Sequence, residues 1–359
     1  MTTTAPAKTS RGTFHTLTVA SVERLCDDAV AVTFEVPEDL RASYDFEAGQ
    51  SLTLRRIIDG EDHRRDYSIC AQVGQRPRVG VRLIPGGRFS EWLVNEVRPG
   101  DEVDVQTPKG SFRAQADGGR HLCIAAGSGI TPMMSIASTV LGNPDSRLTL
   151  LYGNRTTSSV MFAEELADLK NRYGARLDLV HVLSREPRDV ELFSGRLEGE
   201  RLRRLLTTLV PLAAVDHVWL CGPFAMIADC REALEELGIS RDKVHFELFY
   251  VDEPPPELNR PEAVLTGETS NVTVVLDGGS TTAPMPKDQT ILDAAQKARA
   301  DLPFACKGGV CGTCRAHLVS GEADMRRNYA LDDDEVERGF VLTCQTHPVS
   351  DEVTVDYDA

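Results

Sequence analysis

The 359-residue sequence has no apolar run long enough to cross a bilayer, no excess of basic charge and no internal repeat. The first absence argues against a transmembrane helix, which needs about 20 consecutive apolar residues. A formal net charge of −16 argues against nucleic acid as a partner, because binding phosphates requires a basic surface. The start of the chain, MTTTAPAKTSRGTFH, lacks the apolar core of a secretory signal. We therefore expect a cytoplasmic location, where thiols stay reduced.

Four of the nine cysteines carry the strongest chemical signal: Cys306, Cys311, Cys314 and Cys344. The spacing C-x4-C-x2-C with a distant fourth cysteine is typical of a plant-type [2Fe–2S] cluster, which moves one electron at a time. Glycines in the same loop allow the backbone to wrap closely and to point N–H groups at the sulfurs. A zinc ion is the alternative, but its usual signature is two short C-x2-C pairs, and here the fourth cysteine stands alone. Most of the other cysteines are expected to be buried and unreactive.

The pattern of apolar residues changes along the chain and predicts several domains. Residues 12–114 contain short β-branched runs separated by turn residues, which favours a small antiparallel β-barrel. Residues 115–250 alternate apolar strands with helical patterns, which favours an α/β domain with a parallel sheet. A proline-rich linker is expected over 251–268 and the cysteine-bearing domain over 269–359, while 1–11 reads as a disordered lead.

Two segments of the barrel region could hold a flat ring that carries a pyrophosphate. RRDYSIC offers an arginine for a pyrophosphate, a tyrosine for a flat ring and a serine for a ring nitrogen. IPGGRFSEWL places a glycine turn before a helix, whose backbone N–H groups can bind phosphate. Either segment alone is a weak signal, because a surface strand or a turn with an N-cap serine would look the same. The candidate residues are Arg65, Tyr67, Ser68, Gly86, Gly87, Arg88 and Ser90.

Three segments of the α/β region could hold a nicotinamide dinucleotide. AAGSGITPMMS follows an expected strand and opens a helix, which is the position of a dinucleotide phosphate site, although it is not the strict G-x-G-x-x-G pattern. LSRE places a serine and an arginine at a strand end, where they suit the 2′-phosphate of NADP or are simply solvated. LCGP ends another strand, and its glycine leaves space for a nicotinamide ring. The candidates are Gly127, Ser128, Gly129, Ile130, Thr131, Ser184, Arg185, Cys221, Gly222 and Pro223.

Taken in order, RDYS, GGRFS, GSGITP, SRE and CGP resemble the ferredoxin–NADP reductase superfamily, and the cysteine spacing resembles a plant-type ferredoxin. LYGNRTTSSVMFAEELADLK, HVLSREPRDV and PFACKGGVCGTC are similar to the family of phenylacetyl-CoA epoxidase reductase subunits. The resemblance covers about residues 12–359. It implies an antiparallel FAD-binding β-barrel, a parallel-sheet nicotinamide domain and an α+β ferredoxin domain with the β-grasp fold.

The resemblance also implies roles for individual residues. Arg65 would contact the flavin pyrophosphate, Tyr67 would stack on the isoalloxazine and Ser68 would approach N5, so that Tyr67, Ser68 and Cys221 are the expected catalytic residues. Gly87, Arg88 and Ser90 would hold the flavin phosphates. The segments 127–131 and 221–223 would bind the nicotinamide dinucleotide, with Ser184 and Arg185 favouring NADPH over NADH. Phe249 and Tyr250 are weak candidates for an aromatic shield over the flavin.

The implied activity is electron transfer from NADPH to FAD, then to the [2Fe–2S] cluster, and finally to a di-iron oxygenase that epoxidises phenylacetyl-CoA. A full pyrophosphate site favours FAD over FMN. Two alternatives stay open at this point. One is an NADH-dependent reductase for another steroid, alkane or aromatic hydroxylase. The other is a non-enzymatic one-electron carrier or redox sensor, against which the intact flavin and nicotinamide segments argue.

Overall fold

The computed structural model describes residues 13–115, 117–249 and 269–359. The expected lead over 1–11, the expected linker over 251–268 and Tyr250 lie outside these described residues. The chain divides into two compact units, one formed by His15–Glu253 and one formed by Pro254–Ala359 together with the N-terminal end up to Phe14. No helix in the described ranges is long and apolar enough to cross a membrane.

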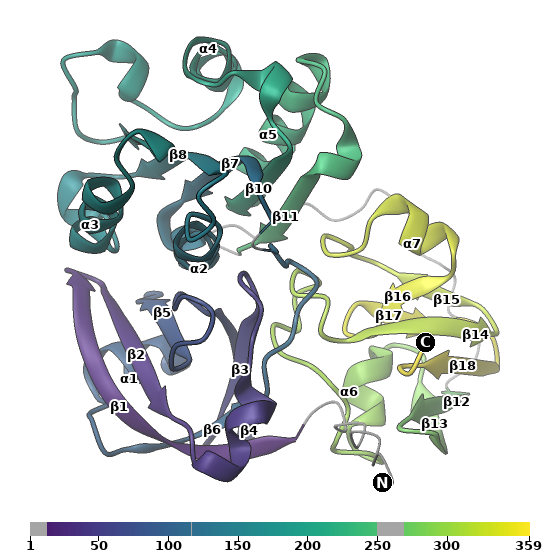
Figure 1. Ribbon diagram of the computed structural model, residues 1–359. Coiled ribbons are helices and arrows are strands. Elements are labelled where there is room, and N and C mark those ends of the chain that lie inside the picture. The colour runs from purple at the N-terminus through teal and green to yellow at the C-terminus, as the bar shows by residue number, and fades with distance from the viewer. Residues whose placement is uncertain (1–12, 116, 250–268) are drawn as a thin grey trace, which may run out of the picture. The chain divides into compact units, whose positions relative to one another are not determined.

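The larger unit begins with a six-stranded sheet that closes into a barrel (Figure 1). The strand order is β4-β3-β6-β1-β2-β5, and Ile69, directly after β4, bridges to Val79 of β5, which joins the two edges. Val30, Val32 and Phe34 alternate along β2 and fill the interior. The antiparallel barrel is therefore confirmed. Its elements are β1 (Phe14–Cys26), β2 (Ala29–Glu35), β3 (Ser51–Ile58), β4 (Glu61–Ser68), β5 (Arg78–Arg82), α1 (Arg88–Asn95) and β6 (Glu102–Gln106).

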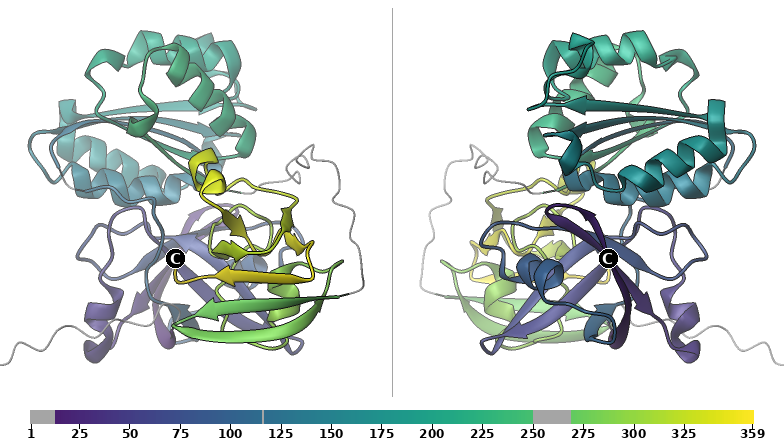
Figure 2. Two further views of the ribbon diagram at one scale, coloured as in Figure 1. Left: turned by 90° about the vertical axis from the view of Figure 1, so that its right-hand side faces the viewer. Right: turned by 90° about the vertical axis from the view of Figure 1, so that its left-hand side faces the viewer.

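A parallel five-stranded sheet of order β11-β10-β7-β8-β9 forms the rest of this unit, as predicted. Helices α2 and α3 cover one face and α4 and α5 the other (Figures 1 and 2). Alternate residues of β7 explain this arrangement, because Cys123 packs with the first helix pair and Leu122 with the second. The elements are β7 (Gly119–Ala126), α2 (Ile130–Val140), β8 (Ser146–Asn154), α3 (Ala163–Tyr173), β9 (Leu177–Leu183), α4 (Gly199–Leu209), β10 (His217–Gly222), α5 (Phe224–Glu236) and β11 (Val244–Leu248).

Strand β5 joins the barrel to the α/β domain through alternate residues that face the same way. Arg78 donates to both oxygens of Glu165 on α3, at 2.9 Å each. Gly80 comes so close to α2 that a Cβ there would lie 2.5 Å from Cγ2 of Thr131. Arg82 donates to the backbone carbonyl of Ser159 in the loop after β8. Side chains two residues apart on a strand point to the same face, so one face of β5 makes all three contacts with the α/β domain.

The smaller unit has a mixed five-stranded sheet of order β13-β12-β18-β14-β16, with β12 and β18 parallel, and a separate β15–β17 pair. Val272, Val274, Ile291, Leu342 and Val355 form part of its core. This α+β architecture was predicted and is confirmed. Its elements are β12 (Thr269–Leu276), β13 (Gly279–Pro286), α6 (Ile291–Ala295), β14 (Arg315–Ser320), β15 (Ala323–Met325), α7 (Asp333–Glu337), β16 (Phe340–Leu342), β17 (Thr346–Pro348) and β18 (Glu352–Asp356).

The order of the parallel strands places β7 next to β10, although three helices separate them in the chain. The chain runs outward from this pair in both directions, and such a switch point is where open α/β sheets bind ligands. The loop after β7 touches the end of β10 there, since a Cβ on Gly129 would lie 2.1 Å from the carbonyl oxygen of Cys221.

We predict that Gly129→Ala destabilises the larger unit by about 1 to 3 kcal/mol, the usual cost of overpacking. The backbones at Gly129 and Cys221 cannot move apart to accept a methyl group, because β7 and β10 are paired up to Ala125 and Cys221. Calorimetry should show an apparent Tm lower by several degrees. Gly279→Ala is the control, since its Cβ would find its nearest atoms at ordinary distances of 3.6 and 3.8 Å. Equal Tm values for the two variants would contradict the close approach.

Candidate cofactor sites

The end of β4 places Tyr67 and Ser68 where the barrel meets the α/β domain. The Tyr67 ring lies 6.2 Å from that of Phe89 on α1, measured between centroids, and Phe89 packs edge-on against Trp92 at 5.5 Å. Burial raises the pKa of Tyr67, so its hydroxyl stays protonated. Arg65 is exposed and donates to the carbonyl oxygen of Arg64 at 2.7 Å. The partly buried tyrosine ring and the exposed arginine guanidinium beside it suit a ligand in which a flat ring is joined to a pyrophosphate.

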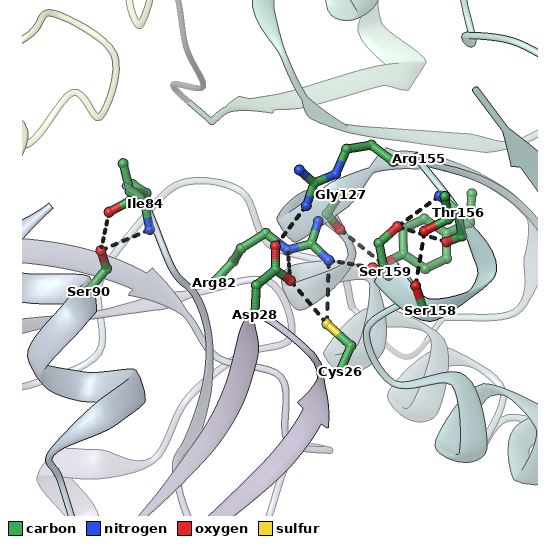
Figure 3. Close-up of polar contacts among 11 residues, drawn as sticks. Cys26, Asp28, Arg82, Ile84, Ser90, Gly127, Arg155, Thr156, Ser158 and Ser159 are labelled. Atoms are coloured by element: carbon green, nitrogen blue, oxygen red, sulfur yellow. Dashed lines mark hydrogen bonds and ion pairs between the residues drawn. The ribbon is translucent and has the colours of Figure 1, made fainter. Parts of the chain in front are cut away.

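The glycine turn before α1 is shaped by the hydroxyl of Ser90. This oxygen accepts from the backbone N–H of Ile84 at 3.1 Å (Figure 3). It also donates to the carbonyl oxygen of Gly87 at 3.0 Å. The N–H of Gly86 donates to Glu91 at 3.0 Å, and Arg88 pairs with Asp59. Ser90 is buried and Arg88, at the start of α1, is exposed, so Arg88 is the more accessible of these two predicted phosphate contacts.

Glu247 completes the group around Ser68, and sequence reasoning missed it. Ser68 donates its Oγ hydrogen to Oε2 of Glu247 on β11 at 3.0 Å, and Glu247 lies in register with Cys221 on β10. Burial raises the pKa of Glu247 to about 7; the hydrogen bond from Ser68 opposes this rise, and the charge of Asp66 adds to it. Burial also raises the pKa of Cys221 well above its ordinary value. A charged residue inside the apolar run FELF was the available signal.

The switch point brings together two of the predicted dinucleotide segments, 127–131 and 221–223. Thr131 Oγ1 donates to the carbonyl oxygen of Ser128 at 3.0 Å, and the hydroxyl of Tyr152 donates to the carbonyl oxygen of Gly127 at 3.0 Å. On the facing loop, a Cβ on Gly222 would lie 2.6 Å from Cε of Met226. Two strand ends that carry glycines therefore lie side by side. Ile130 is buried at the start of α2, and Pro223 occupies the N-cap position of α5.

The next strand ends, those of β8 and β9, carry the residues expected to distinguish NADPH from NADH. The N–H groups of Ser184 and Arg185 donate to the carbonyl oxygens of Asn154 and Arg155 at 2.9 and 2.8 Å. A cavity of about 250 Å³ lies beside them, and Arg155, another residue that sequence reasoning missed, shares it with Arg185. Ser184 is not among its lining residues. These are Asp27, Asp28, Arg155, Thr156, Ser158, Ser159 and Arg185.

The four candidate cluster ligands form two pairs in the smaller unit. Cys306 interacts with Cys311, and this contact lowers the pKa of the Cys306 thiol with help from backbone N–H groups. Cys344 interacts with Cys314, which lowers the pKa of Cys344 and raises that of Cys314. The N–H of Gly308 lies 3.3 Å from the Cys306 sulfur. Such donors favour thiolates.

This pairing fits a binuclear cluster with two thiolates on each iron. A single tetrahedral ion would need the sulfurs to converge on one point. Within the described ranges, no three His, Cys, Asp or Glu side chains are placed to hold one metal ion.

Comparison with known proteins identifies all three regions. The family models "Oxidoreductase FAD-binding domain", "Oxidoreductase NAD-binding domain" and "2Fe-2S iron-sulfur cluster binding domain" match residues 16–114, 123–232 and 274–349. The domain boundaries proposed from the sequence and the role of each site residue stay predictions.

Similar proteins span nearly the whole chain. The sequence is 44% identical over 353 residues to a subunit of the 1,2-phenylacetyl-CoA epoxidase of Escherichia coli (strain K12), covering 97% of this chain and 98% of the relative. It is 31% identical over 351 residues to the 3-ketosteroid-9-alpha-monooxygenase ferredoxin reductase component of Rhodococcus rhodochrous, covering 95% and 96%. The solved structure of phthalate dioxygenase reductase matches with a TM-score of 0.61 and 26% identity, covering 96% of this chain and 98% of that one.

The barrel, the parallel sheet and the cysteine-bearing domain thus correspond to binding domains for FAD, a nicotinamide dinucleotide and a [2Fe–2S] cluster. These matches establish an oxidoreductase, and they exclude a stand-alone one-electron carrier. The chain belongs to the family of flavin- and iron–sulfur-dependent reductase components of multicomponent oxygenases, the family that includes the reductase of phenylacetyl-CoA epoxidase.

Proposed function

We propose that this reductase takes electrons from NADPH and delivers them to a di-iron oxygenase that epoxidises the ring of phenylacetyl-CoA. The observation that carries the proposal is the 44% identity to a component of that epoxidase over 97% of the chain. The steroid monooxygenase reductase is 31% identical over a similar length, which makes a steroid oxygenase the second candidate for the acceptor.

The cofactors supply the redox chemistry, since FAD accepts two electrons together from a nicotinamide and the [2Fe–2S] cluster carries one electron at a time. The protein supplies position and protons. Tyr67 would support the flavin ring, and Gly222 would leave room for the nicotinamide at the switch point. Cys306, Cys311, Cys314 and Cys344 would hold the cluster.

Ser68 and Glu247 would hold a proton where the barrel meets the sheet. The 3.0 Å hydrogen bond between them connects a carboxyl group with a pKa of about 7 to a hydroxyl at the end of β4. A group with such a pKa is partly protonated near neutral pH, so it can accept or release a proton at little cost. We therefore assign Glu247 to the catalytic group, together with Tyr67, Ser68 and Cys221.

The cavity beside β8 and β9 supports NADPH as the donor. A phosphate monoester carries about −1.5 to −2 charges near pH 7, and arginine binds such groups through paired N–H donors. Arg155 and Arg185 both line this cavity at the ends of adjacent strands. Within a dinucleotide site, a pair of cations at this edge suits the 2′-phosphate that distinguishes NADPH from NADH.

Reconstitution tests the proposed acceptor. The FAD- and cluster-loaded reductase is mixed with NADPH and the subunits of a phenylacetyl-CoA di-iron oxygenase, and NADPH consumption is followed with and without phenylacetyl-CoA. We expect consumption to depend on phenylacetyl-CoA and to yield its epoxide. A steroid oxygenase mixed with a ketosteroid is the comparison. Coupling to the steroid system alone would contradict the proposal.

Substitution of Glu247 tests the raised pKa of its carboxyl group. A pKa raised in the folded state stabilises the fold fully below the unfolded pKa, and this stabilisation is lost as pH rises through the folded pKa of about 7. Relative to Glu247→Gln, the wild type should therefore lose about 1 to 3 kcal/mol of stability between pH 5 and pH 8. The readout is the apparent Tm of the flavin-loaded protein at each pH.

The exposed Glu232 on α5 provides the control for this measurement. Glu232→Gln should follow the wild type across the same pH range, because its carboxylate lies in solvent. A Tm difference between wild type and Glu247→Gln that stays constant from pH 5 to pH 8 would show that Glu247 does not titrate there.

A further inference from the structure

Asp28 contacts two arginines at the rim of the cavity beside β8 and β9. It lies in the turn between β1 and β2, so it belongs to the barrel. Its Oδ1 lies 3.2 Å from Nε of Arg82 on β5, and its Oδ2 lies 2.7 Å from Nη2 of Arg155 after β8 (Figure 3). One carboxylate therefore ties a barrel arginine to an arginine of the dinucleotide domain.

Both arginines lie next to candidate phosphate positions. A Cβ on Gly127 would lie 3.2 Å from Nη1 of Arg82, which places this guanidinium at the glycine loop after β7. Arg155 lines the cavity that also contains Arg185. Asp28 thus lies between the loop expected to hold a pyrophosphate and the cavity expected to hold a 2′-phosphate.

A carboxylate and a phosphate make the same kind of contact with arginine, because both offer paired oxygens to its N–H donors. The side chain of Arg155 is half exposed, and ion pairs at such positions are weak. An incoming phosphate can therefore replace the carboxylate at Arg155 without breaking a buried network. Arg82 also donates to the carbonyl oxygen of Ser159, a hydrogen bond that does not involve Asp28.

We propose that Asp28 is an internal counter-ion that occupies Arg155 until the 2′-phosphate of NADPH displaces it. Asp28 then sets both the affinity for NADPH and the degree of preference over NADH. The inference rests on the proposed use of NADPH. It makes Asp28 a specificity-determining residue that opposes binding, whereas the cationic residues of the cavity favour it.

The carboxylate has a closely matched control in its neighbour. Asp27 lines the same cavity and is exposed. Asp27→Asn removes the same charge from the same cavity, so a comparison with Asp28→Asn separates the direct contact with Arg155 from a general change in charge.

The test measures binding of 2′,5′-ADP and 5′-AMP to the FAD- and cluster-loaded protein by titration calorimetry. Asp28→Asn should lower the Kd for 2′,5′-ADP roughly two- to fivefold, the change expected from releasing the one weak ion pair with Arg155. The Kd for 5′-AMP, which has no 2′-phosphate, should stay unchanged. Asp27→Asn should change either Kd less than about twofold. In an Arg155→Ala background, Asp28→Asn should no longer tighten binding.

Weaker or unchanged binding of 2′,5′-ADP by Asp28→Asn would overturn the inference, because it would mean that Asp28 only orients the arginine. Equal tightening of both ligands would overturn it as well. Measurements on wild type and Arg185→Ala distinguish a failure of the inference about Asp28 from a failure of the proposal that NADPH is the electron donor. If wild type binds 2′,5′-ADP no better than 5′-AMP, the proposal of NADPH fails, and the inference fails with it. If wild type binds 2′,5′-ADP more tightly than 5′-AMP and Arg185→Ala loses this preference, the proposal of NADPH as donor is supported whatever the result for Asp28→Asn.

Discussion

The packing of β5 against the α/β domain is the contact on which the flavin–nicotinamide site depends. Arg78 is largely buried, and removing its charge from water would be costly without a partner. The paired hydrogen bonds to Glu165 and the ion pair with Glu23 provide that compensation. Gly80, two residues on, allows the strand to reach α2 at a distance that no side chain would permit. This contact holds the end of β4 beside β11, so that Ser68 meets Glu247.

Two carboxylates near this contact are in opposite situations. Glu247 is partly buried and accepts a hydrogen bond from Ser68, and its raised pKa would make a proton available near neutral pH at the proposed flavin–nicotinamide site. Asp28 is a quarter exposed and paired with two arginines, so it acts as a charge that a ligand can replace. Both join the barrel to the α/β domain, Glu247 through Ser68 and Asp28 through Arg155.

The sequence was enough to predict the features that are local in the chain. The C-x4-C-x2-C spacing, the GSG loop and the CGP turn each occupy only a few consecutive residues, so they can be recognised in the sequence. The alternation of strand and helix patterns predicted the parallel sheet. Glu247, Arg155 and Asp28 could not be predicted in this way. Ser68 and Glu247 are 179 positions apart, and Asp28 and Arg155 are 127 apart, so only the folded topology brings them together. The contact of Ser90 with a phosphate stays a prediction, and the structure adds that its hydroxyl bonds to the backbone of the turn before α1.

The central claim is that electrons from NADPH reach the cluster within this one chain. The most direct measurement is an anaerobic titration of the loaded protein with NADPH, in which absorbance follows the flavin and electron paramagnetic resonance detects the reduced cluster. We expect the cluster signal to grow as the flavin is bleached, approaching one electron per chain, and the flavin of Cys344→Ser to bleach without this signal. A wild-type protein whose flavin is fully bleached while its intact cluster stays oxidised would contradict electron transfer from the flavin to the cluster within one chain.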